Sequence, residues 1–88
     1  MEYVVYILRC ADDSLYTGIT TDLTHRVAVH NSGRGAKYTR SRLPVIPVYW
    51  EMAADKGSAL RREFAIKKLS REEKMQLIAS KQFVNAEE

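Results

Sequence analysis

The chain has 88 residues, which is enough for one compact domain and too few for two. Hydrophobic residues make up 45% of it and charged residues 28%, a composition that excludes a disordered chain and is typical of a soluble globular domain. The formal net charge of +3 is compatible with a nucleic-acid partner without establishing one. No apolar run approaches the ~20 residues that cross a bilayer, so we expect no membrane contact.

The single cysteine, Cys10, excludes an internal disulfide bond and a zinc site built from several cysteines. A lone thiol suits a reducing compartment. The first residues do not combine a basic segment with a long apolar stretch, so they do not resemble a signal peptide. We therefore expect a cytoplasmic protein.

The first predicted element is a strand over residues 3–10, rich in β-branched and aromatic residues and apolar on both faces, which favours a central strand. A turn over residues 11–14 leads to a second strand over 15–19, which completes a hairpin. The later elements are a helix over 23–30 capped by Thr20, Thr21 or Asp22, a basic loop over 33–43, a strand over 48–52, a helix from Asp55 or Ser58 to Lys68, and a helix from the capping box at 70–73 to about Ser80.

These elements predict one α+β domain over residues 1–82, in the order β-β-α-β-α-α, followed by a frayed tail over 83–88. Pro47 precedes the third strand and lacks a backbone N–H group. We therefore expect either that this strand lies at an edge of the sheet or that it starts late.

Two polar residues of the first helix fall on its apolar stripe. At 3.6 residues per turn, Arg26 and His30 share the stripe of Leu23 and Val27. One interpretation is that Arg26 lays its stem over the core and keeps its guanidinium in water. The other is that both side chains face a functional groove.

The long helix shows the same feature more sharply, because Glu63 lies near the middle of a predicted apolar stripe. This stripe comprises Ala59, Leu60, Phe64 and Ile66. A carboxylate removed from water costs several kcal/mol unless it is paired or binds a metal ion. Either a structural salt bridge, for instance to Arg26, or a divalent-cation site would explain it. An arginine, a histidine and a glutamate in one groove suit phosphodiester hydrolysis, since Mg²⁺ often takes only one or two carboxylates.

Several of these residues resemble the GIY-YIG nuclease superfamily in their order and spacing. Tyr6 ends Val4-Val5-Tyr6 on the first strand, and the second strand carries Tyr16-Thr17-Gly18. Arg26 and His30 follow in the next helix, and Glu63 in a later one. The resemblance covers roughly residues 3 to 80 and is closest to small stand-alone bacterial GIY-YIG proteins.

The resemblance implies a three-stranded antiparallel sheet flanked by helices and metal-dependent hydrolysis of DNA, including branched or damaged DNA as in DNA repair. It implies that Glu63 binds one Mg²⁺ or Mn²⁺ ion and that Arg26 stabilises the transition state. It also implies that Tyr6 acts as base, that Tyr16 orients the phosphate or the water, and that His30 assists proton transfer. Larger members carry a separate DNA-binding domain, so a protein partner that supplies substrate recognition is an expectation.

The site requires both tyrosines on one face of the sheet. A three-residue loop over 12–14 pairs Cys10 with Tyr16 and places Tyr6, Tyr16 and Gly18 on one face. A four-residue loop would place the tyrosines on opposite faces. We predict the odd-length loop or an equivalent bulge, and expect Gly18 to let a ring or a phosphate approach closely.

The basic loop is the candidate nucleic-acid contact. Its lysine and arginines can neutralise phosphates, and its tyrosine can stack on an unpaired base. The alternative is a solvated loop without a ligand. The predicted contact residues are Arg34, Lys37, Tyr38, Arg40 and Arg42.

Two other functions remain open from the sequence. A non-catalytic nucleic-acid binding module would have the same fold and bind DNA or RNA without cutting it. A structural or interaction protein would use Arg26 and Glu63 as a salt bridge, and would then lose much stability on Glu63→Ala.

Overall fold

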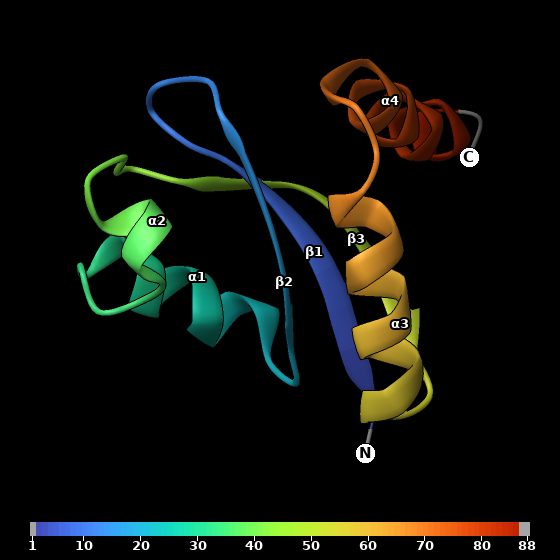
Figure 1. Cartoon of the computed structure of the whole chain (residues 1–88), viewed down its shortest axis with the longest axis horizontal. Coiled ribbons are helices and arrows are strands. Elements are labelled where there is room, and N and C mark those ends of the chain that lie inside the picture. The colour runs from blue at the N-terminus through green and yellow to red at the C-terminus, as the bar shows by residue number, and fades with distance from the viewer. Residues whose placement is uncertain (1, 87–88) are drawn as a thin grey trace.

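The computed structural model describes the backbone of residues 2–86 and the side chains of residues 2–80. A three-stranded antiparallel sheet is flanked by helices, as predicted (Figure 1). The elements in chain order are β1 (Tyr3–Arg9), β2 (Leu15–Thr20), α1 (Leu23–Asn31), α2 (Lys37–Arg40), β3 (Ile46–Ala53), α3 (Lys56–Lys67) and α4 (Arg71–Ala86). Within the described part of the chain, no helix is long and apolar enough to cross a membrane.

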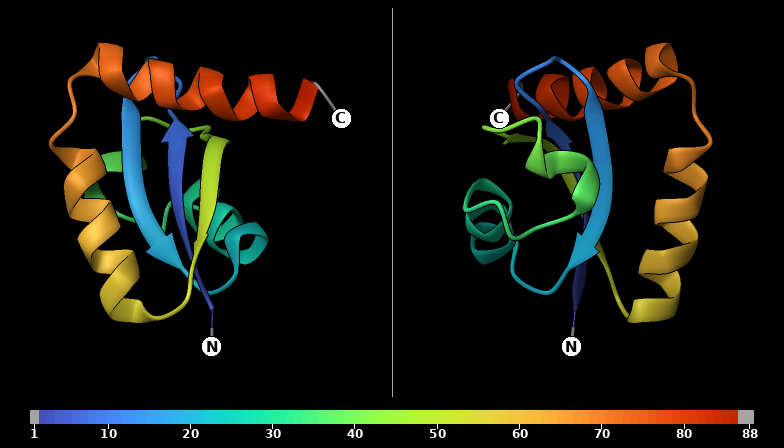
Figure 2. Two further views of the ribbon diagram at one scale, coloured as in Figure 1. Left: turned by 90° about the vertical axis from the view of Figure 1, so that its right-hand side faces the viewer. Right: turned by 60° about the vertical axis from the view of Figure 1, so that its left-hand side comes forward.

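The sheet has the order β2-β1-β3, so the first strand is central, as its two apolar faces predicted. Val5 and Ile7 of β1 pack into a core with α3 and α4, whereas Tyr6 and Leu8 point to the opposite face, toward α1. Figure 2 shows the two helical layers on the two sides of the sheet. Alternation along β1 therefore sends Tyr6 into a different layer from its sequence neighbours.

The hairpin confirms that the two tyrosines share a face, but the predicted pairing of Cys10 with Tyr16 is wrong. Tyr6 lies opposite Gly18, and Tyr16 lies opposite Leu8. The turn closes one residue earlier than predicted, because the Cys10 amide donates to the Ser14 carbonyl at 2.9 Å. Asp13 adopts a positive φ of 71° within this turn, a conformation that Asp accepts more readily than most residues. The loop remains odd in length, so the side-chain alternation is preserved.

The predicted helix starts are confirmed by their caps. Asp22 caps α1 by accepting from the His25 amide, and Asp55 caps α3 by accepting from the Ser58 amide. In α4 the Ser70 hydroxyl accepts from the Glu73 amide, while the Glu73 carboxylate accepts from the Ser70 amide. This reciprocal pair is the predicted capping box.

Three expected boundaries differ from the structure. The basic loop contains a short helix, α2, where the amides of Thr39 and Arg40 both donate to the Ala36 carbonyl. The edge strand β3 includes Pro47, and a register shift in its pairing with β1 accommodates the missing N–H group. The last helix continues to Ala86, since no proline or glycine interrupts it. The end of the expected 83–88 tail, residues 87–88, lies outside the described residues.

Candidate active site

Two tyrosines and a glycine form the base of the candidate site on the sheet. Tyr6 is buried, and its ring centroid lies 6.4 Å from that of Tyr16. A Cβ atom at Gly18 would lie 2.6 Å from the Tyr6 hydroxyl and 3.2 Å from the Tyr16 ring. The absent side chain at Gly18 therefore makes room for both rings, as predicted.

His30 is buried at the end of α1 and joins three elements. The Tyr6 hydroxyl lies 3.1 Å from His30 Nε2. On the other side of the imidazole, Nδ1 lies 2.8 Å from the hydroxyl of Thr39 in α2. The Tyr16 ring contacts the imidazole edge to face, with 5.3 Å between centroids. Both nitrogens of this buried histidine thus have protein partners, so the ring is held in one orientation.

The electrostatic surroundings of Tyr6 favour its protonated form in the free protein. Burial raises the pKa of Tyr6 above its ordinary value of 10.0, and the neighbouring Tyr16 and the negative charge of Glu63 raise it further. A hydrogen bond and the positive charge of Arg26 lower the same pKa, but burial outweighs them. Arg26 and Glu63 are therefore both within electrostatic reach of the Tyr6 hydroxyl.

Glu63 faces inward on α3, as predicted, although the predicted stripe is partly wrong. Its buried neighbours on the helix are Ala59 and Ile66, whereas Leu60 and Phe64 are exposed. The Glu63 side chain is 17% exposed. An inward carboxylate thus lies among small and apolar residues.

The salt-bridge partner of Glu63 is Lys67. The alternative that predicted a salt bridge to Arg26 is wrong. Lys67 Nζ lies 3.0 Å from Glu63 Oε2, one helical turn away, and its side chain is 51% exposed. Among the described residues, no ion pair joins Arg26 to Glu63. Within the described residues, the inward carboxylate therefore has one ion-pair partner, a lysine that reaches it from solvent.

The residues present suit a divalent cation that is completed by its substrate. No group of three or more metal-binding His, Cys, Asp or Glu side chains occurs within the described residues. Glu63 alone would then supply the protein ligand. Mg²⁺ is commonly held by one or two carboxylates, with water and substrate phosphate as the other ligands. One inward carboxylate fits this pattern.

The five predicted contact residues of the basic loop divide into two groups. Arg34, Lys37 and Arg40 are exposed. Arg42 instead forms a salt bridge with Asp12 at 3.0 Å and donates to the Tyr38 carbonyl at 2.7 Å. Its guanidinium also lies over the Tyr38 ring, 3.9 Å from the centroid. Arg42 therefore holds α2 against the hairpin turn, while the other three cations face solvent.

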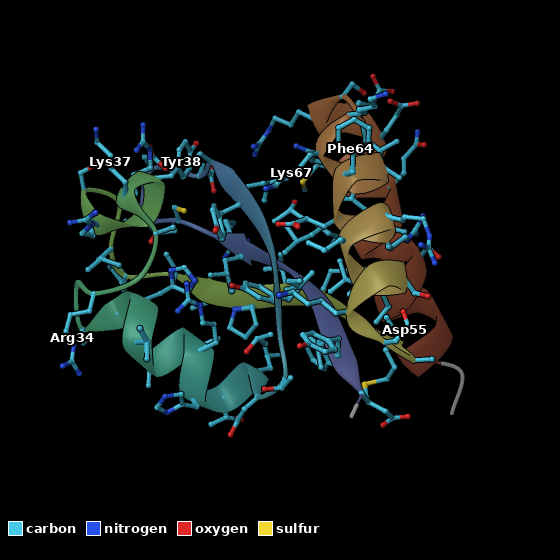
Figure 3. The ribbon with its side chains drawn as sticks, turned by 60° about the horizontal axis from the view of Figure 1, so that its bottom comes forward. Arg34, Lys37, Tyr38, Asp55, Phe64 and Lys67 are labelled. Atoms are coloured by element: carbon cyan, nitrogen blue, oxygen red, sulfur yellow. The ribbon has the colours of Figure 1, made fainter. Side chains whose placement is uncertain are left out.

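Tyr38 connects the basic loop to the site. Its ring stacks on Tyr16, with 6.1 Å between centroids and 23° between planes. Figure 3 shows Lys37 and Tyr38 on one side of β2 and Lys67 of α3 on the other. The stacked pair thus connects the basic loop to Tyr16 of the candidate site.

Comparison with known proteins identifies the family. The GIY-YIG catalytic domain matches residues 2–76. The chain belongs to this family. A UPF0213 protein of Clostridium perfringens is 57% identical over 92% of this chain and 86% of its own length. Another UPF0213 protein, of Staphylococcus haemolyticus, is 52% identical over 88% of this chain and 94% of its own length. The solution structure of a UPF0213 protein from Bacillus halodurans has a TM-score of 0.61 and 48% identity over 92% of this chain and 86% of that one.

Two contacts of the GIY-YIG residues were not predicted from the sequence: the one between Thr39 and His30 and the one between Lys67 and Glu63. Thr39 lies in the segment predicted as a loop, and nothing in its spacing from His30 indicates a contact. Lys67 follows Glu63 by one helical turn, a spacing typical of ion pairs that could have identified it. The structure therefore adds one partner to His30 and one to Glu63.

Gly18→Ala is expected to destabilise the protein by about 1–3 kcal/mol, because the new methyl group would overlap the buried Tyr6 hydroxyl. Urea unfolding measures this loss. Gly57→Ala is the matched control, since its nearest side-chain atoms would lie 3.5 Å away. A Gly18→Ala variant as stable as the wild type would show that the tyrosines do not pack as described.

The stability of the fold is expected to fall as the pH falls below 6.5. Burial lowers the pKa of His30 from 6.5, and the charge of Arg26 lowers it further. Between the lowered pKa and 6.5 the unfolded chain binds more protons than the folded one, so acid favours unfolding. Urea unfolding across this range should show the loss in the wild type and in the exposed-residue variant His25→Gln, but a smaller loss in His30→Gln. Equal pH dependence in all three would contradict the burial of a neutral His30.

Proposed function

We propose that this chain is a metal-dependent endonuclease that hydrolyses phosphodiester bonds of DNA, including branched or damaged DNA. The observation that carries the proposal is the surroundings of one hydroxyl group. The Tyr6 hydroxyl is buried, hydrogen bonded to His30 and within reach of the opposite charges of Arg26 and Glu63. A non-catalytic binding site has no need of such an arrangement.

The proton path runs from the attacking water through Tyr6 to His30. As water attacks the phosphorus atom, the Tyr6 oxygen accepts a proton from that water and its own hydrogen passes to His30 Nε2, 3.1 Å away. The bond from phosphorus to the leaving oxygen breaks, and that oxygen takes a proton from solvent. The lowered pKa of His30 keeps the imidazole neutral, and so able to accept, at physiological pH.

The charged residues act on the phosphate. Arg26 neutralises the phosphate oxygens as negative charge develops on them, and Tyr16 orients the phosphate or the water. Glu63 would hold the cation, Mg²⁺ or Mn²⁺, which when bound supplies further positive charge to the phosphate. Glu63 must exchange its contact with Lys67 for this role. Because Lys67 is half exposed, it can swing into solvent at little cost.

The exposed cations of the basic loop supply the contacts to the DNA backbone. Arg34, Lys37 and Arg40 are exposed, and so can neutralise phosphates. Binding through such contacts weakens as the salt concentration rises. Arg42 supports this surface through its contacts with Asp12 and Tyr38. Tyr38 is 40% exposed, so an unpaired base can contact it.

The experiment that tests the proposal is cleavage of labelled duplex, flap, junction and single-stranded DNAs with Mg²⁺, with Mn²⁺ or with EDTA. Cleavage of at least one of them that requires metal supports the nuclease function and identifies the substrate class. Salt-sensitive binding without cleavage under any of these conditions would make the chain a binding module instead.

A further inference from the structure

We propose that Thr39 is a positioning residue that holds His30 in the one neutral tautomer able to accept the Tyr6 proton. Thr39 lies in α2, outside the set of residues that handle the phosphate, and its hydroxyl contacts the imidazole of His30. Its contribution to cleavage rests on the proposed function, whereas its effect on the tautomer does not.

The argument begins with the single hydrogen of the Thr39 hydroxyl. Thr39 Oγ1 lies 2.9 Å from the carbonyl oxygen of Ala36, which can only accept a hydrogen bond. The hydroxyl hydrogen therefore points to Ala36, and a lone pair of Thr39 faces His30 Nδ1 at 2.8 Å. Nδ1 must then carry the hydrogen of that contact. A bare Nδ1 would draw the hydroxyl hydrogen away and leave two oxygens 2.9 Å apart with no hydrogen between them.

The consequence appears on the other side of the ring. A neutral imidazole has one N–H group, so a hydrogen on Nδ1 leaves Nε2 as an acceptor. The Tyr6 hydroxyl, 3.1 Å away, then donates to Nε2. The donors run in one direction, from Tyr6 to His30, from His30 to Thr39 and from Thr39 to Ala36. When Nε2 takes the Tyr6 proton, the imidazolium keeps its bond to Thr39 unchanged.

Burial prevents other groups from taking over this role. His30 and Thr39 have no exposed surface, so water cannot replace the hydroxyl without a structural change. The backbone of Gly35 packs directly on the imidazole, where a Cβ atom would lie 2.3 Å from Nδ1 and 2.8 Å from Cγ. The ring is thus held from the side as well as at both nitrogens. Because α2 contains Thr39, this short helix acts on the site through the imidazole tautomer.

The test is two-bond proton–nitrogen NMR of the imidazoles in the full chain labelled with ¹⁵N-histidine, at a pH well above 6.5. This spectrum distinguishes the two neutral tautomers. Thr39→Val keeps the side-chain shape and removes the acceptor, whereas Thr39→Ser keeps the hydroxyl. His25, which is exposed on α1, is the internal reference in each spectrum.

The wild type and Thr39→Ser are expected to show His30 with the hydrogen on Nδ1, and Thr39→Val to lose this pattern while His25 is unchanged. Single-turnover cleavage by Thr39→Val is expected to fall by about 10-fold or more, with recovery in Thr39→Ser. A wild-type His30 with its hydrogen on Nε2, or an unchanged tautomer in Thr39→Val, would overturn the proposal. If no DNA is cleaved by the wild type, the nuclease function fails, but the spectra still decide the role of Thr39.

Discussion

Glu63→Gln is expected to reduce single-turnover cleavage by about 100-fold or more while the protein stays folded. Glutamine keeps the size of the side chain and removes the negative charge that a divalent cation requires. We therefore also expect weaker binding of Mn²⁺, measured by electron paramagnetic resonance without DNA. Loss of both cleavage and Mn²⁺ binding would assign Glu63 as the metal ligand.

The same substitution separates the nuclease from a purely structural protein. The only ion pair of Glu63 in the described part of the chain is with Lys67, four residues later on the same helix, and i,i+4 helix pairs contribute about 0.3–0.5 kcal/mol. Urea unfolding should therefore show a change below about 1 kcal/mol. Glu72→Gln, at an exposed position of α4, is the matched control for loss of one charge. Unaltered cleavage, or a loss of several kcal/mol, would contradict the assignment.

Tyr6→Phe is expected to lower the cleavage rate by about 10²–10⁴-fold with little change in DNA affinity. The substitution removes one buried hydroxyl and leaves the ring that packs beside Tyr16 and Gly18. The proton path from water to His30 is then interrupted. Single-turnover rates measure the first effect, and fluorescence anisotropy with labelled DNA measures the second.

Tyr3→Phe is the matched control, because Tyr3 lies on the same strand but packs against the core on the opposite face. We expect it to cleave as the wild type does. A moderate loss of stability in Tyr6→Phe, about 1–3 kcal/mol, is compatible with the account because His30 Nε2 loses its donor. A Tyr6→Phe variant that cleaves at the wild-type rate would exclude Tyr6 as the base.

Local signals in the sequence predicted most of the fold. The apolar character of residues 3–10 predicted the central strand, and Asp22, Ser70 and Glu73 predicted two helix starts that the structure confirms. These features depend on residues within a few positions of one another. The inward placement of His30 and Glu63 also followed from helical periodicity, because it depends only on the 3.6-residue repeat.

Two kinds of feature were not predicted: a turn whose residues permit more than one conformation, and contacts between distant segments. The hairpin turn closes early because Asp13 takes a positive φ, which an aspartate permits but does not require. The short helix α2 is held by the Arg42 contacts to Asp12 and to Tyr38, and the first of these joins residues on separate segments. The bond between Thr39 and His30 depends on the same docking of α2. Because this segment was predicted as a loop, the contact of Thr39 with His30 was not predicted.

The most direct test of the central claim is single-turnover cleavage in water enriched in ¹⁸O, with mass spectrometry of the product ends. The account predicts cleavage that starts with Mg²⁺, stops with EDTA, and places one ¹⁸O atom in the new terminal phosphate, because water is the nucleophile. Absence of product with bound DNA and metal present, or a terminal phosphate without ¹⁸O, would contradict hydrolysis at this site.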